Sequence, residues 1–103
     1  MTAKVKSVYE DLKYANADEM LIKARLVTEI ADQLKIRRLT QAEAAGLLGF
    51  SQPKLSNLLR GQFRGVSEKK LMECLTRLGR DIEIIVRPAP RSRREGRITV
   101  EVT

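Results

Sequence analysis

Two short helical patterns on either side of a Gly-Phe-Ser-Gln-Pro corner constrain this chain more than any other feature. They lie in residues 40–61, TQAEAAGLLGFSQPKLSNLLRG. Thr40 and Glu43 have the spacing of a capping box, in which a hydroxyl and a carboxylate bind the first free amides of a helix. Gly49 suits the left-handed backbone that ends a helix, and Ser51 can cap the next one. We therefore predict two short helices joined by a tight turn.

The apolar residues of this stretch predict how the two helices pack. Ala45 lies where the helices would cross, and its small side chain lets the backbones approach. Leu55, Leu58 and Leu59 are spaced i, i+3, i+4 and form one apolar stripe on the second helix. The other side of that helix is polar or cationic and contains Pro53, Lys54, Asn57 and Arg60. Such a surface suits the major groove of DNA, and an ordinary helical hairpin with a solvated polar side is the alternative.

The charge pattern favours the first interpretation. The chain has 20 basic and 13 acidic residues and a net charge of +7, which favours a polyanionic partner. Acidic residues are absent between Glu43 and Glu68, whereas Lys54, Arg60 and Arg64 fall inside that gap. The cations of the second helix and of the segment after it therefore have no carboxylate near them in the sequence.

The composition limits the function classes. The 103 residues have room for one small domain. Histidine is absent, and no acid pair or Ser-Lys arrangement stands out, so we do not expect an enzyme. The single cysteine, Cys74, excludes an internal disulfide and a cysteine-based zinc site, and we expect no cofactor. The chain lacks an apolar run long enough for a membrane span, and its start lacks the apolar core of a secretory signal. We therefore expect a cytoplasmic protein without membrane contact.

The flanking segments complete the predicted helical domain, residues 16–80. Residues 1–15 have little periodicity and are expected to form an N-terminal arm, either a loose segment or a short helical turn. A helix capped by Asn16 or Asp18 should follow, with Lys23 and other charged residues opposite an apolar stripe of Met20, Ala24, Val27, Ala31 and Leu34. Ser67 can cap a later helix that ends at Gly79 and buries Cys74 as a small apolar residue.

The apolar period changes in the last part of the chain. Alternation at Ile82, Ile84 and Val86, and again from Ile98 to Val102, predicts short strands in residues 81–103. A lone two-stranded hairpin is marginal in water, so these strands need the helical body or a second subunit as a partner. The predicted fold is mainly α, with four to five helices in a DNA-binding domain followed by short C-terminal β-strands.

The central stretch resembles a known family. LTQAEAAGLLGFSQPKLSNLLRG is similar to the helix-turn-helix of the XRE, or lambda-repressor-like, family, whose pattern is Gln, three residues, Ala, three residues, Gly. Gln41, Ala45 and Gly49 match that pattern. NADEMLIKARLVTEIADQL, FRGVSEKKLMECLTRLG and DIEIIVRPAP extend the resemblance to the compact, HigA-type antitoxin branch. The resemblance implies a lambda-repressor-like fold and a sequence-specific DNA-binding transcriptional regulator.

The resemblance also implies roles for single residues. The positions expected at the DNA are Gln41, Gln52, Pro53, Lys54, Ser56, Asn57, Arg60 and Arg64. Gln41 would bind phosphate and brace Gln52. Lys54 and Asn57 would contact bases together with Gln52, and Ser56 would assist, while the two arginines would contact the backbone. The proline departs from the usual polar residue and leaves an apolar contact, such as one with a thymine methyl.

The expected partners follow from the small size of one helix-turn-helix. Its few base contacts predict a homodimer on double-stranded DNA, bound to a palindromic operator with half-sites about 34 Å apart or a multiple of that. The C-terminal strands are the candidate dimer contact. The resemblance further implies an antitoxin that represses its own operon and binds a small RNA-cleaving toxin. A repressor without a toxin is the alternative, and an RNA-binding or protein-interaction module is a third interpretation.

Overall fold

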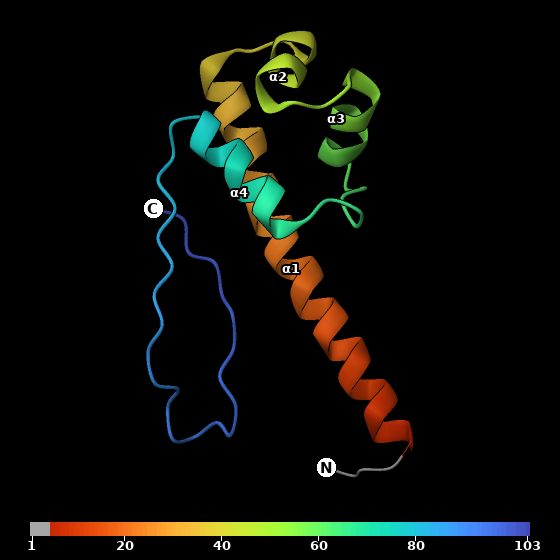
Figure 1. Ribbon diagram of the computed structural model, residues 1–103, viewed down its shortest axis with the longest axis vertical. Helices are drawn as coiled ribbons and strands as arrows, with labels where there is room; N and C mark the ends of the chain where they lie inside the picture. Colours follow the sequence, from red (N-terminus) through yellow and green to blue (C-terminus); the bar gives the residue numbers. More distant parts are fainter. Residues whose placement is uncertain (1–4) are drawn as a thin grey trace.

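Four helices form the body of the protein (Figure 1). The computed structural model describes the backbone of residues 5–103 and the side chains of residues 18–103. The helices are α1 (Val5–Arg37), α2 (Gln41–Leu48), α3 (Gln52–Leu59) and α4 (Glu68–Arg77). α1 packs mainly against α4, and α2 packs against α3. Within residues 5–103, no helix has both the length and the apolar character that a membrane span requires.

α1 is the longest element and sets the long dimension of the molecule. Its 33 residues rise about 50 Å, and the longest dimension of the protein is 50 Å. The helix begins at Val5, so the predicted start at Asn16 or Asp18 is wrong. Residues 5–15 contain no glycine or proline to stop a helix, so α1 extends through them without an amphipathic pattern. Residues 1–4 of the predicted arm lie outside the described residues.

The three shorter helices begin at the caps that the sequence predicts. Thr40 Oγ1 accepts a hydrogen bond from the Glu43 amide at 3.1 Å, and the Glu43 carboxylate accepts one from the Thr40 amide at 2.9 Å. Ser51 and Ser67 each accept a hydrogen bond from the amide three residues later. These bonds satisfy amides that have no partner inside the helix, so each short helix has a defined start.

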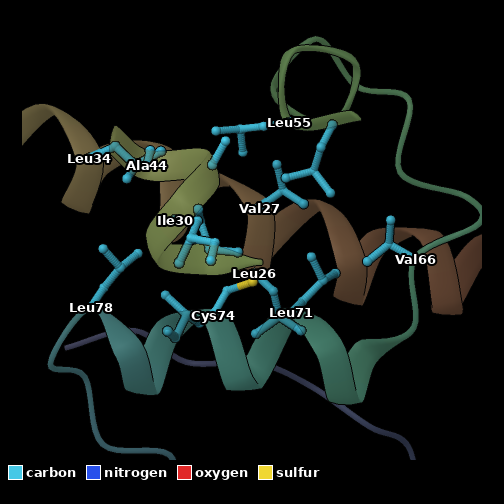
Figure 2. Close-up of a cluster of buried hydrophobic side chains, with 14 residues drawn as sticks. Leu26, Val27, Ile30, Leu34, Ala44, Leu55, Val66, Leu71, Cys74 and Leu78 are labelled. Carbon is cyan, nitrogen blue, oxygen red and sulfur yellow. The ribbon is translucent and has the colours of Figure 1, made fainter. Parts of the chain in front are cut away.

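The hydrophobic core lies between the four helices and takes side chains from all of them (Figure 2). Ile30 of α1, Leu48 of α2, Leu55 of α3 and Leu71 of α4 are completely buried. Full burial of each such side chain stabilises the fold by about 1.5–3 kcal/mol relative to exposure. The other buried apolar residues are Leu26, Val27, Leu34, Ala44, Ala45, Leu58, Val66, Cys74, Leu75 and Leu78.

Cys74 is one of these core residues, as the sequence predicts. Its sulfur lies among aliphatic side chains of α1 and α4 in Figure 2. Burial raises the pKa of the Cys74 thiol, and the positive charges of Lys70 and Arg77 act in the opposite direction more weakly. The thiol therefore stays protonated and packs as a small apolar group.

The C-terminal segment, residues 80–103, contains no β-strand, so the predicted strands are wrong. Figure 1 shows two extended arms, and Arg80 Nη2 donates to the carbonyl of Thr103 where their ends meet. Within the segment, one backbone–backbone hydrogen bond forms, from the Arg93 amide to the Pro90 carbonyl at 3.0 Å. The alternating residues therefore lack the ladder of hydrogen bonds that defines a sheet. Most of their side chains are exposed, and two pack partly against the core: Ile82 and Val100.

Candidate nucleic-acid interface

The turn between α2 and α3 has the predicted geometry. Gly49 has a φ of +78°, and its amide donates to the Ala45 carbonyl at 2.9 Å. A residue with a side chain would be strained in this left-handed conformation. Ala45 is 4% exposed, and Leu55 and Leu58 are fully buried, so a small residue and a leucine stripe hold the two helices together. The third leucine of the stripe, Leu59, is half-buried against the core.

Two cations from α4 hold the end of α2. Lys70 Nζ donates to the Leu48 carbonyl at 2.9 Å, and Arg77 Nη1 donates to the Leu47 carbonyl at 3.2 Å. The last carbonyls of a helix have no partner inside it and attract positive charge. Lys70 Nζ also lies 4.9 Å from the centre of the Phe50 ring. α4 therefore fixes the position of the turn, a contact that the sequence does not predict.

A buried lysine holds the loop that follows α3. Lys23 of α1 is 3% exposed, and its Nζ donates to the Arg64 carbonyl at 2.8 Å. The same nitrogen lies 3.3 Å from the Glu19 carboxylate. A buried ammonium group is tolerated when it is both paired and hydrogen-bonded, and Lys23 meets both conditions. The contact fixes the backbone that carries the predicted phosphate-contacting side chain of Arg64. The helical spacing predicts only that Lys23 lies on the charged side of α1 and does not indicate this role.

The predicted DNA-contacting residues come from three neighbouring segments. Gln41 is the first residue of α2 and Gln52 is the first residue of α3. No hydrogen bond joins these two side chains in the described part of the chain. Ser56 and Asn57 are half-buried, and the remaining six side chains are exposed: Gln41, Gln52, Pro53, Lys54, Arg60 and Arg64. Contact of these residues with DNA stays a prediction.

One pair among the predicted residues is directly connected. Arg60 Nη2 donates to Asn57 Oδ1 at 2.6 Å. The i, i+3 spacing places the two side chains next to each other at the end of α3. The bond orients the Asn57 amide, whose NH₂ group remains as a donor, and leaves other N–H groups on Arg60 for phosphate oxygens. The spacing is the sequence signal that would have predicted this pair.

The predicted DNA-contacting cations are not neutralised by described carboxylates. Lys54, Arg60 and Arg64 form no ion pair with any carboxylate among residues 18–103. Ion pairs in that part of the chain join Lys23 to Glu19 and Arg80 to Glu29. Cations that are not neutralised by the protein can replace the counterions of a nucleic-acid backbone. The acid-free gap in the sequence therefore corresponds to a surface suited to a polyanion.

Comparison with known proteins connects this surface to a family. A family model described as a helix-turn-helix domain matches residues 8–87. A solved structure described as an XRE family transcriptional regulator is 40% identical, with a TM-score of 0.78. The match covers 84% of this chain and 98% of that chain. The chain belongs to the XRE helix-turn-helix family. The resemblance based on Gln41, Ala45 and Gly49 is thereby confirmed at the level of the family.

The family match extends well beyond the two short helices. It includes α2, α3 and α4, most of α1, and the first arm of the C-terminal segment up to Arg87. The α4 contacts with α2 and the Lys23 contact with Arg64 thus lie inside the XRE family domain. No curated protein matches the sequence.

Proposed function

We propose that this XRE family protein is a transcriptional regulator that binds a specific DNA site through α3. One observation carries the proposal. The exposed side of α3 combines polar and cationic residues without an acid, and its opposite side is anchored in the core by Leu55 and Leu58. A rigid helix of this kind presents donors, acceptors and cations to base edges and phosphates in the major groove. The 40% identical relative, described as a transcriptional regulator, supports the same role.

The position of each residue supports a division of roles. Base contacts are assigned to Gln52, Pro53, Lys54, Ser56 and Asn57, and phosphate contacts to Gln41, Arg60 and Arg64. The first group lies on α3 itself, whereas the second group lies at the start of α2 and after the end of α3. Gln41 also braces Gln52 in this proposal when both approach the DNA. Within the second group, the Lys23 contact fixes the backbone of Arg64.

DNA footprinting upstream of the protein's own gene tests the assignment. Asn57→Ala should weaken binding to the protected site by about 1–3 kcal/mol and change binding to random DNA much less. Arg64→Gln should weaken both and lower the salt slope by about one. Arg64 is a cleaner control than Arg60, because Arg60 is bonded to Asn57. Equal losses on both DNAs for Asn57→Ala would contradict the base contact.

We also propose that the regulator acts in the cytoplasm as a homodimer on a palindromic operator. Two copies of α3 double the base and phosphate contacts of one. The C-terminal segment is the candidate contact, because five of the eight exposed large aliphatic residues among residues 18–103 lie in it: Ile84, Ile85, Val86, Ile98 and Val102. Sedimentation of the full chain should give the mass of two copies at concentrations that saturate the operator. A monomer that saturates each half-site independently would contradict the dimer.

The finer proposal is that the protein is an antitoxin that represses its own operon and binds a small RNA-cleaving toxin. Figure 1 shows the first part of α1 extending past the other helices, at the far end of the molecule from α3. A partner bound there would leave α3 open to DNA. In this proposal the toxin contacts the apolar residues Val8, Tyr9 and Leu12 near the start of the chain, and the alternative is that they pack against the protein's own body. Their side chains lie outside the described residues.

The neighbouring gene separates this proposal from the alternative, a regulator without a toxin. Co-expression with a small basic protein encoded beside the gene should give a stable complex in which RNA cleavage by that protein is suppressed. Operator binding without such a partner would support the alternative. Preference for RNA over the operator duplex would contradict both and favour an RNA-binding module.

A further inference from the structure

The arginine loop, residues 87–97 with the sequence RPAPRSRREGR, has an unusual choice of cation. It contains five arginines and one glutamate. The C-terminal segment as a whole has six arginines and no lysine, whereas residues 1–79 have six arginines and eight lysines. A guanidinium group can donate two parallel hydrogen bonds to one phosphate, which an ammonium group cannot do. The composition thus favours phosphate binding over simple solubility, which lysine would serve equally well.

The guanidinium groups of the arginine loop make almost no polar contact with the described part of the chain. None of them forms an ion pair with a carboxylate of residues 18–103, and only Arg93 donates to a backbone carbonyl, that of Glu95 at 3.3 Å. The helical body differs, because four of its cations donate to carbonyls of distant segments: Lys23, Arg37, Lys70 and Arg77. The exposed cations of the loop are Arg87, Arg91, Arg94 and Arg97.

The loop is also far from the surface that contacts the proposed operator. Figure 1 shows the tip of the C-terminal segment at the opposite end of the molecule from α2 and α3, along a dimension of 50 Å. Charges in physiological salt are screened over about 8 Å, so the loop does not add to the field at α3. All of the loop except Arg87 lies beyond the residues matched by the family model. It is therefore an addition to the helix-turn-helix domain.

We infer that the arginine loop is a second DNA-binding surface, which holds the phosphate backbone of a duplex segment other than the half-site at α3. The inferred affinity of the loop for DNA follows from the arginines of the loop alone. The statement that α3 holds the other duplex segment, the operator half-site, rests on the proposed function. A molecule with two separate surfaces can hold two duplexes, or two distant stretches of one DNA molecule, at the same time.

Capture of a second duplex tests this inference. The full-length protein is bound to immobilised operator DNA, and a labelled duplex of random sequence is then added. Arg91→Gln/Arg94→Gln should keep operator binding, reduce capture of the random duplex at least tenfold at about 0.1 M salt, and lower the salt slope of random-duplex binding by about two. The matched control, Arg25→Gln/Lys69→Gln, removes the same charge from exposed positions on α1 and α4 and should keep the capture.

The outcomes separate this inference from the proposed function. Unchanged capture and an unchanged salt slope in the loop variant would overturn it. An equal loss in the control variant would also overturn it, because net charge alone would then explain the binding. Binding of both variants to poly-glutamate is measured as well. If Arg91→Gln/Arg94→Gln loses binding to poly-glutamate but keeps binding to the random duplex, the loop binds an acidic protein and the inference is overturned. If Asn57→Ala leaves operator binding intact while the loop variant still loses capture, the role of α3 fails and the loop inference stands.

Discussion

The helical body, residues 18–79, and the C-terminal segment both carry regular apolar patterns, but the two regions use them differently. All buried apolar residues in the described part of the chain lie between Leu26 and Leu78. In the C-terminal segment, Ile84 is 78% exposed and Val86 is 92% exposed. The i, i+3, i+4 repeat thus corresponds to a packed surface, whereas most of the alternating repeat remains in solvent and only Ile82 and Val100 pack partly against the core.

The difference shows what each pattern needs in order to form structure. A helix satisfies its backbone hydrogen bonds within itself, so capped helices need only an apolar stripe and a neighbour to pack against. A strand satisfies its hydrogen bonds on another strand, and alternation alone does not supply that strand. The two arms of the C-terminal segment form no such ladder, which leaves their backbone and aliphatic side chains for a second molecule.

The largest expected effect is a difference in the free energy of unfolding between two substitutions, one in each region. Leu55→Ala should lower the free energy of unfolding by about 2–5 kcal/mol, because Leu55 is completely buried between the helices. Ile84→Ala should change it by less than about 0.5 kcal/mol at low protein concentration, because that side chain is exposed. Urea denaturation of the full chain measures both.

Protein concentration sharpens the same comparison. If the C-terminal segment is the dimer contact, the cost of Ile84→Ala should increase as the concentration is raised, while the cost of Leu55→Ala stays constant. A cost above about 2 kcal/mol for Ile84→Ala at every concentration would contradict the comparison, because it would place the side chain in the core of the single chain.

The second prediction concerns the buried cation of the body. Lys23→Met should lower the free energy of unfolding by about 1–3 kcal/mol, because the Arg64 carbonyl loses its donor while the aliphatic part of the side chain is kept. Lys69→Met changes an exposed lysine and is the matched control. Chemical denaturation measures the free energy of unfolding of both variants. Equal small losses would show that Lys23 has no structural role.

Features of the fold that depend on a local contact could be predicted from the sequence. Thr40, Ser51 and Ser67 each bind an amide three residues away, so short patterns predict these caps and the turn at Gly49. The sequence does not predict the start of α1, because the residue before it, Lys4, is not of a capping type and no glycine or proline interrupts residues 5–15. The motif at Gln41, Ala45 and Gly49 predicts the family for the same reason, since its three residues lie within α2 and the turn that ends it.

Features that depend on contacts between distant segments could not be predicted from the sequence. Lys23 is 41 residues from Arg64, and Lys70 is 22 residues from Leu48. A charged residue on a helix has the same pattern whether it faces solvent or a distant carbonyl, so neither role could be predicted from spacing. The C-terminal strands were predicted wrongly for a related reason, because a local alternation does not determine whether a partner strand is present.

A smaller effect is expected at the start of α2. Thr40→Ala should lower the free energy of unfolding by about 1 kcal/mol, because the Glu43 amide loses its acceptor. The matched control in the C-terminal segment is Thr99→Ala, at an exposed position, which should change it by less than about 0.5 kcal/mol. Thermal and chemical denaturation should both show a larger loss of stability for Thr40→Ala than for Thr99→Ala. A cost at Thr99 equal to that at Thr40 would show that the segment is as ordered as the helical body.

The smallest expected effect is a dependence of stability on pH from the same capping box. The hydrogen bond from the Thr40 amide lowers the pKa of Glu43 below its ordinary value of 4.5, and the Thr40 hydroxyl contributes in the same direction. The folded state therefore binds a proton less readily than the unfolded state. The stabilisation is complete above the unfolded pKa and is lost as the pH falls through the folded pKa.

Glu43→Gln should leave stability near pH 7 almost unchanged, because a glutamine side chain can still accept from the Thr40 amide. It should reduce the loss of stability below about pH 4.5, because the glutamine has no proton to bind. Glu101→Gln, at an exposed position of the C-terminal segment, is the control and should retain the full acid dependence. Denaturation curves between about pH 3 and pH 7 measure this difference. An acid dependence reduced equally by both substitutions would mean that it reflects net charge, and that the capping box does not distinguish the helical body from the segment that follows it.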